Sequence, residues 1–361
     1  MKKLLLLLLL PLLSGLCQQA LAQAEKSQLT LADPYILLED GTYYAYGTYD
    51  ANGIRCYSST DLKYWRYRGL ALNKKNTTED RWFWAPEVYH VGDKYIMYYS
   101  ANEHLYAATS KSPVGPFRQV GSYQMENLLK DEKCIDSSVF FDTDGTAYLF
   151  FVRFTDGNCI WQVRLSDDYI TPVEGTLRKC LSATEPWECK LGKVAEGPNV
   201  LKVGKRYFLT YSANDYRSQD YAVGYACANS ISRASWTKQS KYSPFLHQWN
   251  GLYGTGHHSL FTDKEGKLRI VFHAHDSKEN VNPRRMYIGT VEVHGSIMRM
   301  TKDEMVVPVL GTPPTGVQAP ASQQASTSAA TYYSTDGVRH GKPVAGVNLV
   351  RRDGRVRKVL H

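Results

Sequence analysis

Three carboxylic acids and one histidine stand in short polar signatures that recur along the chain. They are Asp33, Asp136, Glu196 and His257, in the signatures Asp-Pro-Tyr, Asp-Ser-Ser, Glu-Gly-Pro-Asn and Gly-His-His-Ser. Two carboxyl groups can perform acid and base catalysis when one is ionised and the other carries a proton. Brought together at one place, these four residues would form an active site.

Each of these residues also has a simpler structural explanation. Asp33 precedes Pro34, a common way to open a turn, and Asp136 precedes two serines, where it could bond backbone amides at a strand start. His257 could be a neutral side chain that bridges buried polar groups. Glu196 is the hardest to explain in this way, because Glu is not a turn former. Their shared position in a repeat favours catalysis.

The repeat becomes visible in the residues that come after each signature. A turn with glycine comes next, and then an apolar run rich in tyrosine. The turns are Asp40-Gly41, Gly92-Asp93, Asp144-Gly145, Gly204-Lys205 and Glu265-Gly266, and the runs begin at Tyr43, Tyr95, Tyr148, Tyr207 and Leu268. Short strands repeated at intervals of roughly 50 residues are typical of a β-propeller.

The fold class that we predict is therefore all-β, a five-bladed β-propeller over residues 29–310. Its last strands are expected at Met286 to Val293 and, returning, near Met305 to Val309. The first strand of every propeller blade lines the central channel, so equivalent positions should converge on one axis. Counted from the turns, these positions read Asp33, Pro86 or Glu87, Asp136, Glu196 and His257.

Both ends of the chain differ from this body in composition. Residues 1–22 read as a signal peptide, with Lys2-Lys3 followed by a leucine-rich core too short for a transmembrane span. Cys17 raises the alternative of a lipoprotein anchor, although Leu16 suits that cleavage poorly. Export would place the protein in the periplasm, on the cell surface or outside the cell. The six remaining cysteines permit disulfides, and none has the spacing of a zinc site.

Residues 311–331 are uncharged and rich in Pro, Ser, Thr and Ala, so we interpret them as a linker. Residues 332–361 form a short basic tail with a small β unit, which resembles the C-terminal tails of exported bacterial proteins that act in sorting or attachment. A basic tail without structure is the alternative. Most of the formal net charge of +8 lies at the two ends of the chain. The body is nearly neutral, so a nucleic-acid partner is not indicated.

Taken together, the signatures resemble those of glycoside hydrolase family 43, over about residues 31–293. The resemblance rests on their order along the chain: Asp33-Pro34, Trp84-Ala85-Pro86-Glu87, Asp136-Ser137-Ser138-Val139-Phe140, Glu196-Gly197-Pro198-Asn199 and Gly256-His257-His258-Ser259. It implies a five-bladed propeller that releases arabinose or xylose from plant cell-wall oligosaccharides or polysaccharides with inversion of the anomeric configuration.

The resemblance also implies a role for each carboxylate. Asp33 matches the general base, Glu196 the general acid, and Asp136 the residue that raises the pKa of the acid and orients it. Inversion needs the base and the acid roughly 6.5–9.5 Å apart, a gap that opposite walls of a propeller channel provide.

Further residues are implied to bind substrate or an ion. Trp84 should wall the sugar subsite, with Phe83 and Trp82 alternating around it. Arg284 or Arg285 matches an arginine that reaches substrate hydroxyls, and Arg284 has the better register. His257 matches a histidine beneath the sugar that helps to hold a hydrated calcium or sodium ion on the axis, whereas His258 points to the opposite face. No cofactor is required for the chemistry.

The sequence leaves one alternative function open and disfavours two others. A β-galactosidase acting on galactan belongs to the same family. A glycan-binding propeller without activity would have no need of the three carboxylates. Retaining fructosidases share the propeller but carry an Asn-Asp-Pro-Asn-type nucleophile signature and a Glu-Cys acid signature. Here the first signature reads Leu31-Ala32-Asp33-Pro34-Tyr35 and Glu196 is followed by Gly197, so this class is disfavoured.

Overall fold

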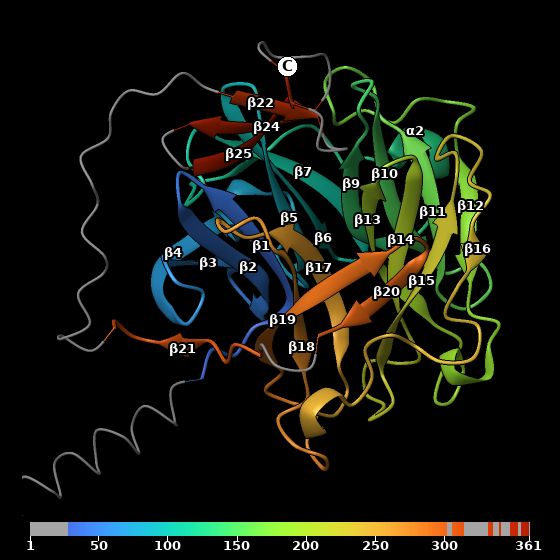
Figure 1. Cartoon of the computed structure of the whole chain (residues 1–361). Coiled ribbons are helices and arrows are strands. Elements are labelled where there is room, and N and C mark those ends of the chain that lie inside the picture. The colour runs from blue at the N-terminus through green and yellow to red at the C-terminus, as the bar shows by residue number, and fades with distance from the viewer. Residues whose placement is uncertain are drawn as a thin grey trace, which may run out of the picture.

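The structure, a computed structural model, describes residues 28–301, 305–313, 331–334, 339–340, 347–352 and 355–360. Five sheets follow one another around a ring, each with four antiparallel strands and the first with a further parallel strand, and their colours run from the blue of the first to the orange of the fifth (Figure 1). The predicted five-bladed β-propeller is therefore confirmed. The expected signal peptide (1–22), Cys17 and most of the linker lie outside the described residues.

The strands of each blade run outward from the channel in chain order, and blade 1 gains an extra strand at its outer edge. Blades 1 and 2 consist of β1 (Ala32–Glu39), β2 (Thr42–Asp50), β3 (Gly53–Ser59), β4 (Tyr64–Asn73), and β5 (Trp84–Val91), β6 (Lys94–Ala101), β7 (His104–Ser110), β8 (Arg118–Gln119). Blade 3 consists of β9 (Cys134–Phe141), β10 (Ala147–Arg153), β11 (Cys159–Arg164) and β12 (Arg178–Ser182). Blades 4 and 5 consist of β13 (Ala195–Val203), β14 (Arg206–Ala213), β15 (Ala222–Ala228), β16 (Thr237–Lys238), and β17 (Gly256–Thr262), β18 (Leu268–Ala274), β19 (Arg285–His294), β20 (Ile297–Met300).

The core lies between neighbouring blades. Aromatic and apolar side chains from facing sheets form five buried clusters, one at each interface between blades. Between blades 1 and 2, for example, Tyr46 and Tyr99 are completely buried in one cluster. The tyrosine-rich runs of the sequence are thus mainly second strands, whose two faces pack against two different blades.

The ring is closed by segments from both ends of the propeller. A short strand, β21 (Val309–Leu310), pairs in parallel with the outer strand β4 of blade 1. On the other side, the amide of Met286 in blade 5 donates to the carbonyl of Leu29 at 3.0 Å. The return strand expected near residues 305–309 therefore exists in part. The outer strand β20 was not predicted, because its sequence lies beyond the repeated pattern.

Four further strands follow the propeller: β22 (Thr331–Ser334), β23 (Arg339–His340), β24 (Val347–Arg352) and β25 (Arg355–Leu360). They form one sheet in the order β23-β22-β24-β25, drawn in red at the top of Figure 1. This sheet is the expected β-rich tail, and β25 lies beside β5.

Helix is confined to short turns in the described part of the chain: α2 (Glu126–Leu129) and the 3-10 turns η1 (Lys74–Asn76), η2 (Pro186–Glu188) and η3 (Trp249–Gly251). None of these described helices has the length and apolarity that a membrane crossing needs. The six cysteines from Cys56 to Cys227 are all free thiols.

Candidate active site

Every inner strand carries an irregularity at the same place near its start. The ladder to the second strand shifts its register there, as in a β-bulge, and one residue of each bulge has a positive φ. These residues are Asp33 (49°), Ala85 (42°), Asp136 (59°), Gly197 (52°) and His257 (42°). Bulges bend a strand and re-aim its side chains, and left-handed backbone at residues other than glycine is concentrated at functional sites.

These bulges correct the repeat positions that were counted from the turns. Asp33, Asp136 and His257 are equivalent, as predicted, but blade 2 places Ala85 there instead of Pro86 or Glu87, and blade 4 places Gly197 instead of Glu196. Glu196 stands one residue earlier than the other two acids. The connection from the first to the second strand has two residues in blades 1, 2 and 4 and five residues in blades 3 and 5, so a count from the turn does not reach the same place in every blade.

The bulges surround a small cavity on the channel axis. Its volume is about 10 Å³, which is room for about one water molecule. Asp33, Asp136, Gly197 and His257 are among the residues that line it, and Glu196 adjoins it through Gly197. A larger cavity of about 240 Å³ is lined by residues further along the same five strands. That cavity is lined mainly by apolar side chains and contains none of the three carboxylates, so the chemistry favours the smaller one.

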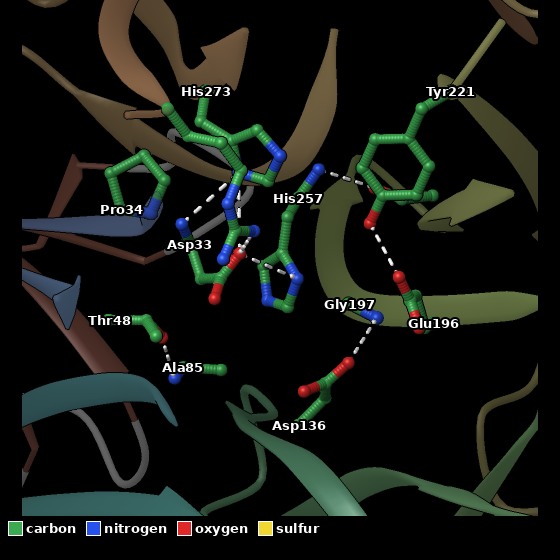
Figure 2. Close-up of polar contacts among 12 residues, drawn as sticks. Asp33, Pro34, Thr48, Ala85, Asp136, Glu196, Gly197, Tyr221, His257 and His273 are labelled. Atoms are coloured by element: carbon green, nitrogen blue, oxygen red, sulfur yellow. Dashed lines mark hydrogen bonds and ion pairs between the residues drawn. The ribbon is translucent and has the colours of Figure 1, made fainter. Parts of the chain in front are cut away.

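Asp33 is held as a carboxylate by its neighbours. Its Oδ1 accepts a hydrogen bond from Arg284 at 2.7 Å, and the Nδ1 atoms of His273 and His257 lie 3.3 and 3.4 Å away (Figure 2). Burial opposes the charge, and the positive charge of Arg284 is the largest of the causes that outweigh it. The pKa of Asp33 therefore lies well below its usual range, and the group is ready to accept a proton.

Glu196 is in the opposite state. Burial, which is the largest cause, and the negative charge of Asp33 raise the pKa of Glu196 to about 7. Two donors oppose this rise: Tyr221 Oη donates to Oε1 at 2.8 Å and Asn158 Nδ2 to Oε2 at 3.0 Å. The result is a carboxyl group that can carry a proton near neutral pH, as a general acid must.

Asp136 lies between the two in blade order. Burial comes first among the causes that raise its pKa well above the usual range, followed by the charges of Glu196 and Asp33. One bond works in the other direction, because the backbone amide of Gly197 donates to Oδ2 at 3.1 Å (Figure 2). Asp136 is therefore tied directly to the residue that follows Glu196.

Of the two arginines that were predicted to bind substrate, only one lies at the carboxylates. Arg284 reaches Asp33, whereas Arg285 turns away and pairs with Asp276 at 2.7 Å. Trp84 is partly exposed and stacks on Trp82 with the ring centroids 5.7 Å apart.

The prediction that Phe83 lines the sugar subsite disagrees with its position. Only 2% of Phe83 is exposed, and its ring packs on Tyr99 in the core between blades 1 and 2. The aromatic surface beside Trp84 is instead Trp82, which is 45% exposed. Side chains alternate along an extended segment, and the alternation here buries the middle residue of the three.

His257 was also predicted to hold an axial ion through waters. Among the described residues, no three His, Cys, Asp or Glu side chains are arranged to hold a metal ion, and Nδ1 of His257 faces Asp33. The protein groups therefore do not fit direct coordination, and no step of the reaction is derived through a metal. Binding of calcium or sodium through waters stays a prediction. His258 turns to Thr210, with Nε2 2.7 Å from Oγ1.

Three residues of the site were missed by sequence reasoning: Tyr221, Asn158 and His273. Tyr221 is completely buried beside Gly256, where a Cβ atom would come within 2.3 Å of the tyrosine ring. His273 accepts the amide of Asp33 at Nδ1, at 3.2 Å. These residues come from second strands and loops, outside the signatures of the inner strands. The one signal available was Gly256, which directly precedes His257 and leaves room for a large neighbour.

Comparison with known proteins agrees with this geometry. The family model described as "Glycosyl hydrolases family 43" matches residues 27–306. The chain is 27% identical over 279 residues to an extracellular exo-α-(1→5)-L-arabinofuranosidase of Streptomyces avermitilis, in a match that covers 69% of this chain and 55% of that protein. It is 26% identical over 311 residues to extracellular endo-α-(1→5)-L-arabinanase 1 of Bacillus subtilis, covering 76% and 90%.

Among solved structures, an endo-1,4-β-xylanase from Bacteroides thetaiotaomicron has 42% sequence identity and a TM-score of 0.74. That match covers 79% of this chain and 98% of the other. The chain spans only about half the length of several curated relatives that it matches.

Proposed function

Because the chain belongs to the glycosyl hydrolases of family 43, we propose that it hydrolyses O-glycosidic bonds of plant polysaccharides with inversion, releasing arabinofuranose or xylose. One observation carries the proposal. The surroundings push the pKa values of two carboxyl groups apart, that of Asp33 downward and that of Glu196 upward. A pair divided in this way assigns the base and the acid.

The reaction then proceeds in one displacement. Asp33 accepts a proton from water as the water oxygen bonds to the anomeric carbon. Glu196 donates its proton to the departing glycosidic oxygen as the bond between that oxygen and the anomeric carbon breaks. At the end Asp33 is protonated and Glu196 is ionised, so exchange of one proton with solvent restores the enzyme. The attack comes from the face opposite the leaving group, which inverts the anomeric centre.

The substrate class is supported by the aromatic surface and by the relatives. The stacked rings of Trp84 and Trp82 offer an apolar face suited to the C–H face of a sugar. The named relatives act on α-1,5-linked arabinan or on β-1,4-linked xylan, whose sugars are pentoses. We also propose that the enzyme is exported, on the basis of the leader-like composition of residues 1–22.

Hydrolysis of aryl α-L-arabinofuranoside, β-D-xyloside and β-D-galactoside, with arabinan and xylan as polymers, tests the activity and the sugar. Proton NMR of the first product decides the stereochemistry, and a product with retained configuration would contradict the mechanism. No hydrolysis of any of these substrates, together with measurable binding of the polymers, would favour a glycan-binding propeller.

Two variants separate the roles of the acid and the base. Glu196→Ala should lose activity steeply, by about 100-fold or more, on oligosaccharides, whose leaving group must be protonated. The loss should be much smaller on activated aryl glycosides, because their leaving groups depart as anions. Asp33→Ala should lose both activities alike, since water must be activated whatever departs. Equal losses for both variants on both substrates would contradict the assignment.

A further inference from the structure

The backbone amides of the five bulges follow a rule with one exception. In four blades, the amide of the left-handed residue donates to a side chain on the second strand of the preceding blade. The bonds run from Ala85 to Thr48 Oγ1 (2.8 Å), from Asp136 to Ser100 Oγ (2.9 Å), from His257 to Ser212 Oγ (2.8 Å) and from Asp33 to His273 Nδ1 (3.2 Å).

The strand register shows which residue should complete the set. Each acceptor pairs, within its own blade, with the residue just before the left-handed one: Thr48 with Ala32, Ser100 with Trp84, Ser212 with Glu196 and His273 with Gly256. In blade 3 the residue that pairs in this way with Ile135 is Val152. Val152 is completely buried, and its side chain has no atom that can accept a hydrogen bond.

The amide that Val152 leaves without an acceptor belongs to Gly197. A buried backbone N–H is costly unless it finds a partner, and this one donates to Oδ2 of Asp136. Figure 2 shows both situations, with Ala85 bonded to Thr48 and Gly197 bonded to Asp136. The one break in the fivefold pattern therefore falls where two of the three acidic residues meet.

We propose that Val152 is a positioning residue, which by withholding an acceptor directs the Gly197 amide to Asp136 and so favours the ionised form of Asp136 beside Glu196. This inference rests on the proposed function, in which Glu196 is the acid. Two interacting carboxyl groups share protons as a pair, and an N–H bond to one of them favours its ionised form. The bond from Gly197 opposes the burial and the negative charges that raise the pKa of Asp136, and so shifts the shared proton toward Glu196.

Val152→Thr tests the inference, because threonine has nearly the shape of valine and supplies the missing hydroxyl. The Gly197 amide would then be shared, and Asp136 would retain a proton to higher pH. With no negative charge on Asp136 beside it, Glu196 would lose its proton more easily. We expect the alkaline limb of the kcat profile to move to lower pH. We also expect kcat on oligosaccharides to fall by about tenfold more than on activated aryl glycosides, within the range of acid catalysis.

Two controls separate the hydroxyl from packing. Val163→Thr makes the same change at a completely buried position on β11 of the same blade, away from the bulge amides. Val152→Ala removes two methyl groups without adding an acceptor. Both variants should keep the alkaline limb in its place even if they unfold at lower temperature. A limb that stays fixed in Val152→Thr, or moves equally in Val152→Ala, would overturn the inference.

A ¹³C NMR titration of the labelled carboxyl groups provides a readout that does not need activity. The pKa of Asp136 should be higher in Val152→Thr than in the parent protein. If the parent hydrolyses no glycoside and this pKa still moves, the proposed function fails and the positioning by Val152 stands. If the parent is active and this pKa is unchanged, the inference about Val152 fails alone.

Discussion

Two carboxyl groups around one channel can have opposite states of ionisation because different groups lie beside them. Asp33 has an arginine and two histidines within reach of its Oδ1, whereas the contacts of Glu196 are the neutral donors Tyr221 and Asn158. Both are buried, and burial alone would raise both pKa values. The cationic charge of Arg284 therefore makes the difference between base and acid.

Arg284 and Arg285 form a natural pair of variants for testing this point. Arg284→Gln removes the positive charge that keeps Asp33 ionised, so the pKa of Asp33 should rise. The acidic limb of the kcat/KM profile should then move to higher pH by a unit or more, in line with shifts of about 1–3 units for such pairs. Arg285→Gln removes only the contact with Asp276 and should leave this limb in place. Equal behaviour of the two variants would contradict the role of Arg284.

At the scale of the strands, the repeat could be predicted from the sequence but the exact phase could not. Glycine turns and tyrosine-rich runs report strands and their order, because both depend on local patterns. The connections between first and second strands are two residues long in three blades and five residues long in the other two, so the distance from a turn does not fix the phase of an inner strand. Phe83 was misplaced for a related reason, since alternation fixes opposite sides for neighbours but does not say which side is buried.

The residues that hold the acid could not be predicted at all. Tyr221 and Asn158 come from loops beside the second and third strands of two different blades. Their contact with Glu196 depends on the tertiary arrangement of blades 3 and 4, which no local spacing encodes. The signatures of the inner strands thus reported the carboxylates, and the family resemblance added Arg284, but neither reported the other partners.

Strand β5 buries a carboxyl group that the proposed reaction does not use. Glu87 is 7% exposed on the channel axis, where Tyr89 Oη donates to its Oε2. Burial raises the pKa of Glu87 to about 7, so the folded protein binds its proton more tightly than the unfolded chain does. The contribution of this group to stability is present below the unfolded pKa near 4.5 and is lost as the pH rises through about 7.

Glu87→Gln should therefore raise stability at alkaline pH, because the amide stays neutral at every pH. We expect a gain of up to about 3 kcal/mol at pH 8.5 and little change at pH 4.5, measured by urea unfolding at both values. Glu265→Gln, at an exposed turn, serves as the control and should show no such dependence. A gain of the same size at both pH values would show that Glu87 affects stability by another route than its charge.

At the scale of the whole molecule, the ring depends on contacts between its first and last segments. The amide of Gly311 donates to the carbonyl of Trp65 at 3.0 Å, just beyond the pairing of β21 with β4. A propeller that ends before β21 would leave the outer edge of blade 1 unpaired. The functional ring therefore extends to Gly311, one residue beyond the boundary at 310 expected from the sequence.

The tail beyond this point should be dispensable for folding and catalysis. Deleting residues 314–361 retains β21 and Gly311, and the deleted segment begins with an uncharged chain that cannot transmit packing energy. We expect Tm to change by less than about 2 °C, which for a domain of this size corresponds to less than about 1 kcal/mol, and kcat to stay within about twofold. Deleting residues 305–361, which also removes β21, should lower Tm by several degrees and is the matched control.

The position of β25 beside β5 defines what the contrary result would mean. If the shorter deletion lowers Tm as much as the longer one, the tail sheet docks on blade 2 and belongs to the folded enzyme. If Tm and kcat are unchanged while the protein accumulates in a different compartment of its native cell, the tail acts in sorting or attachment. Unchanged location together with unchanged Tm would leave the tail without either role and would contradict the sorting proposal.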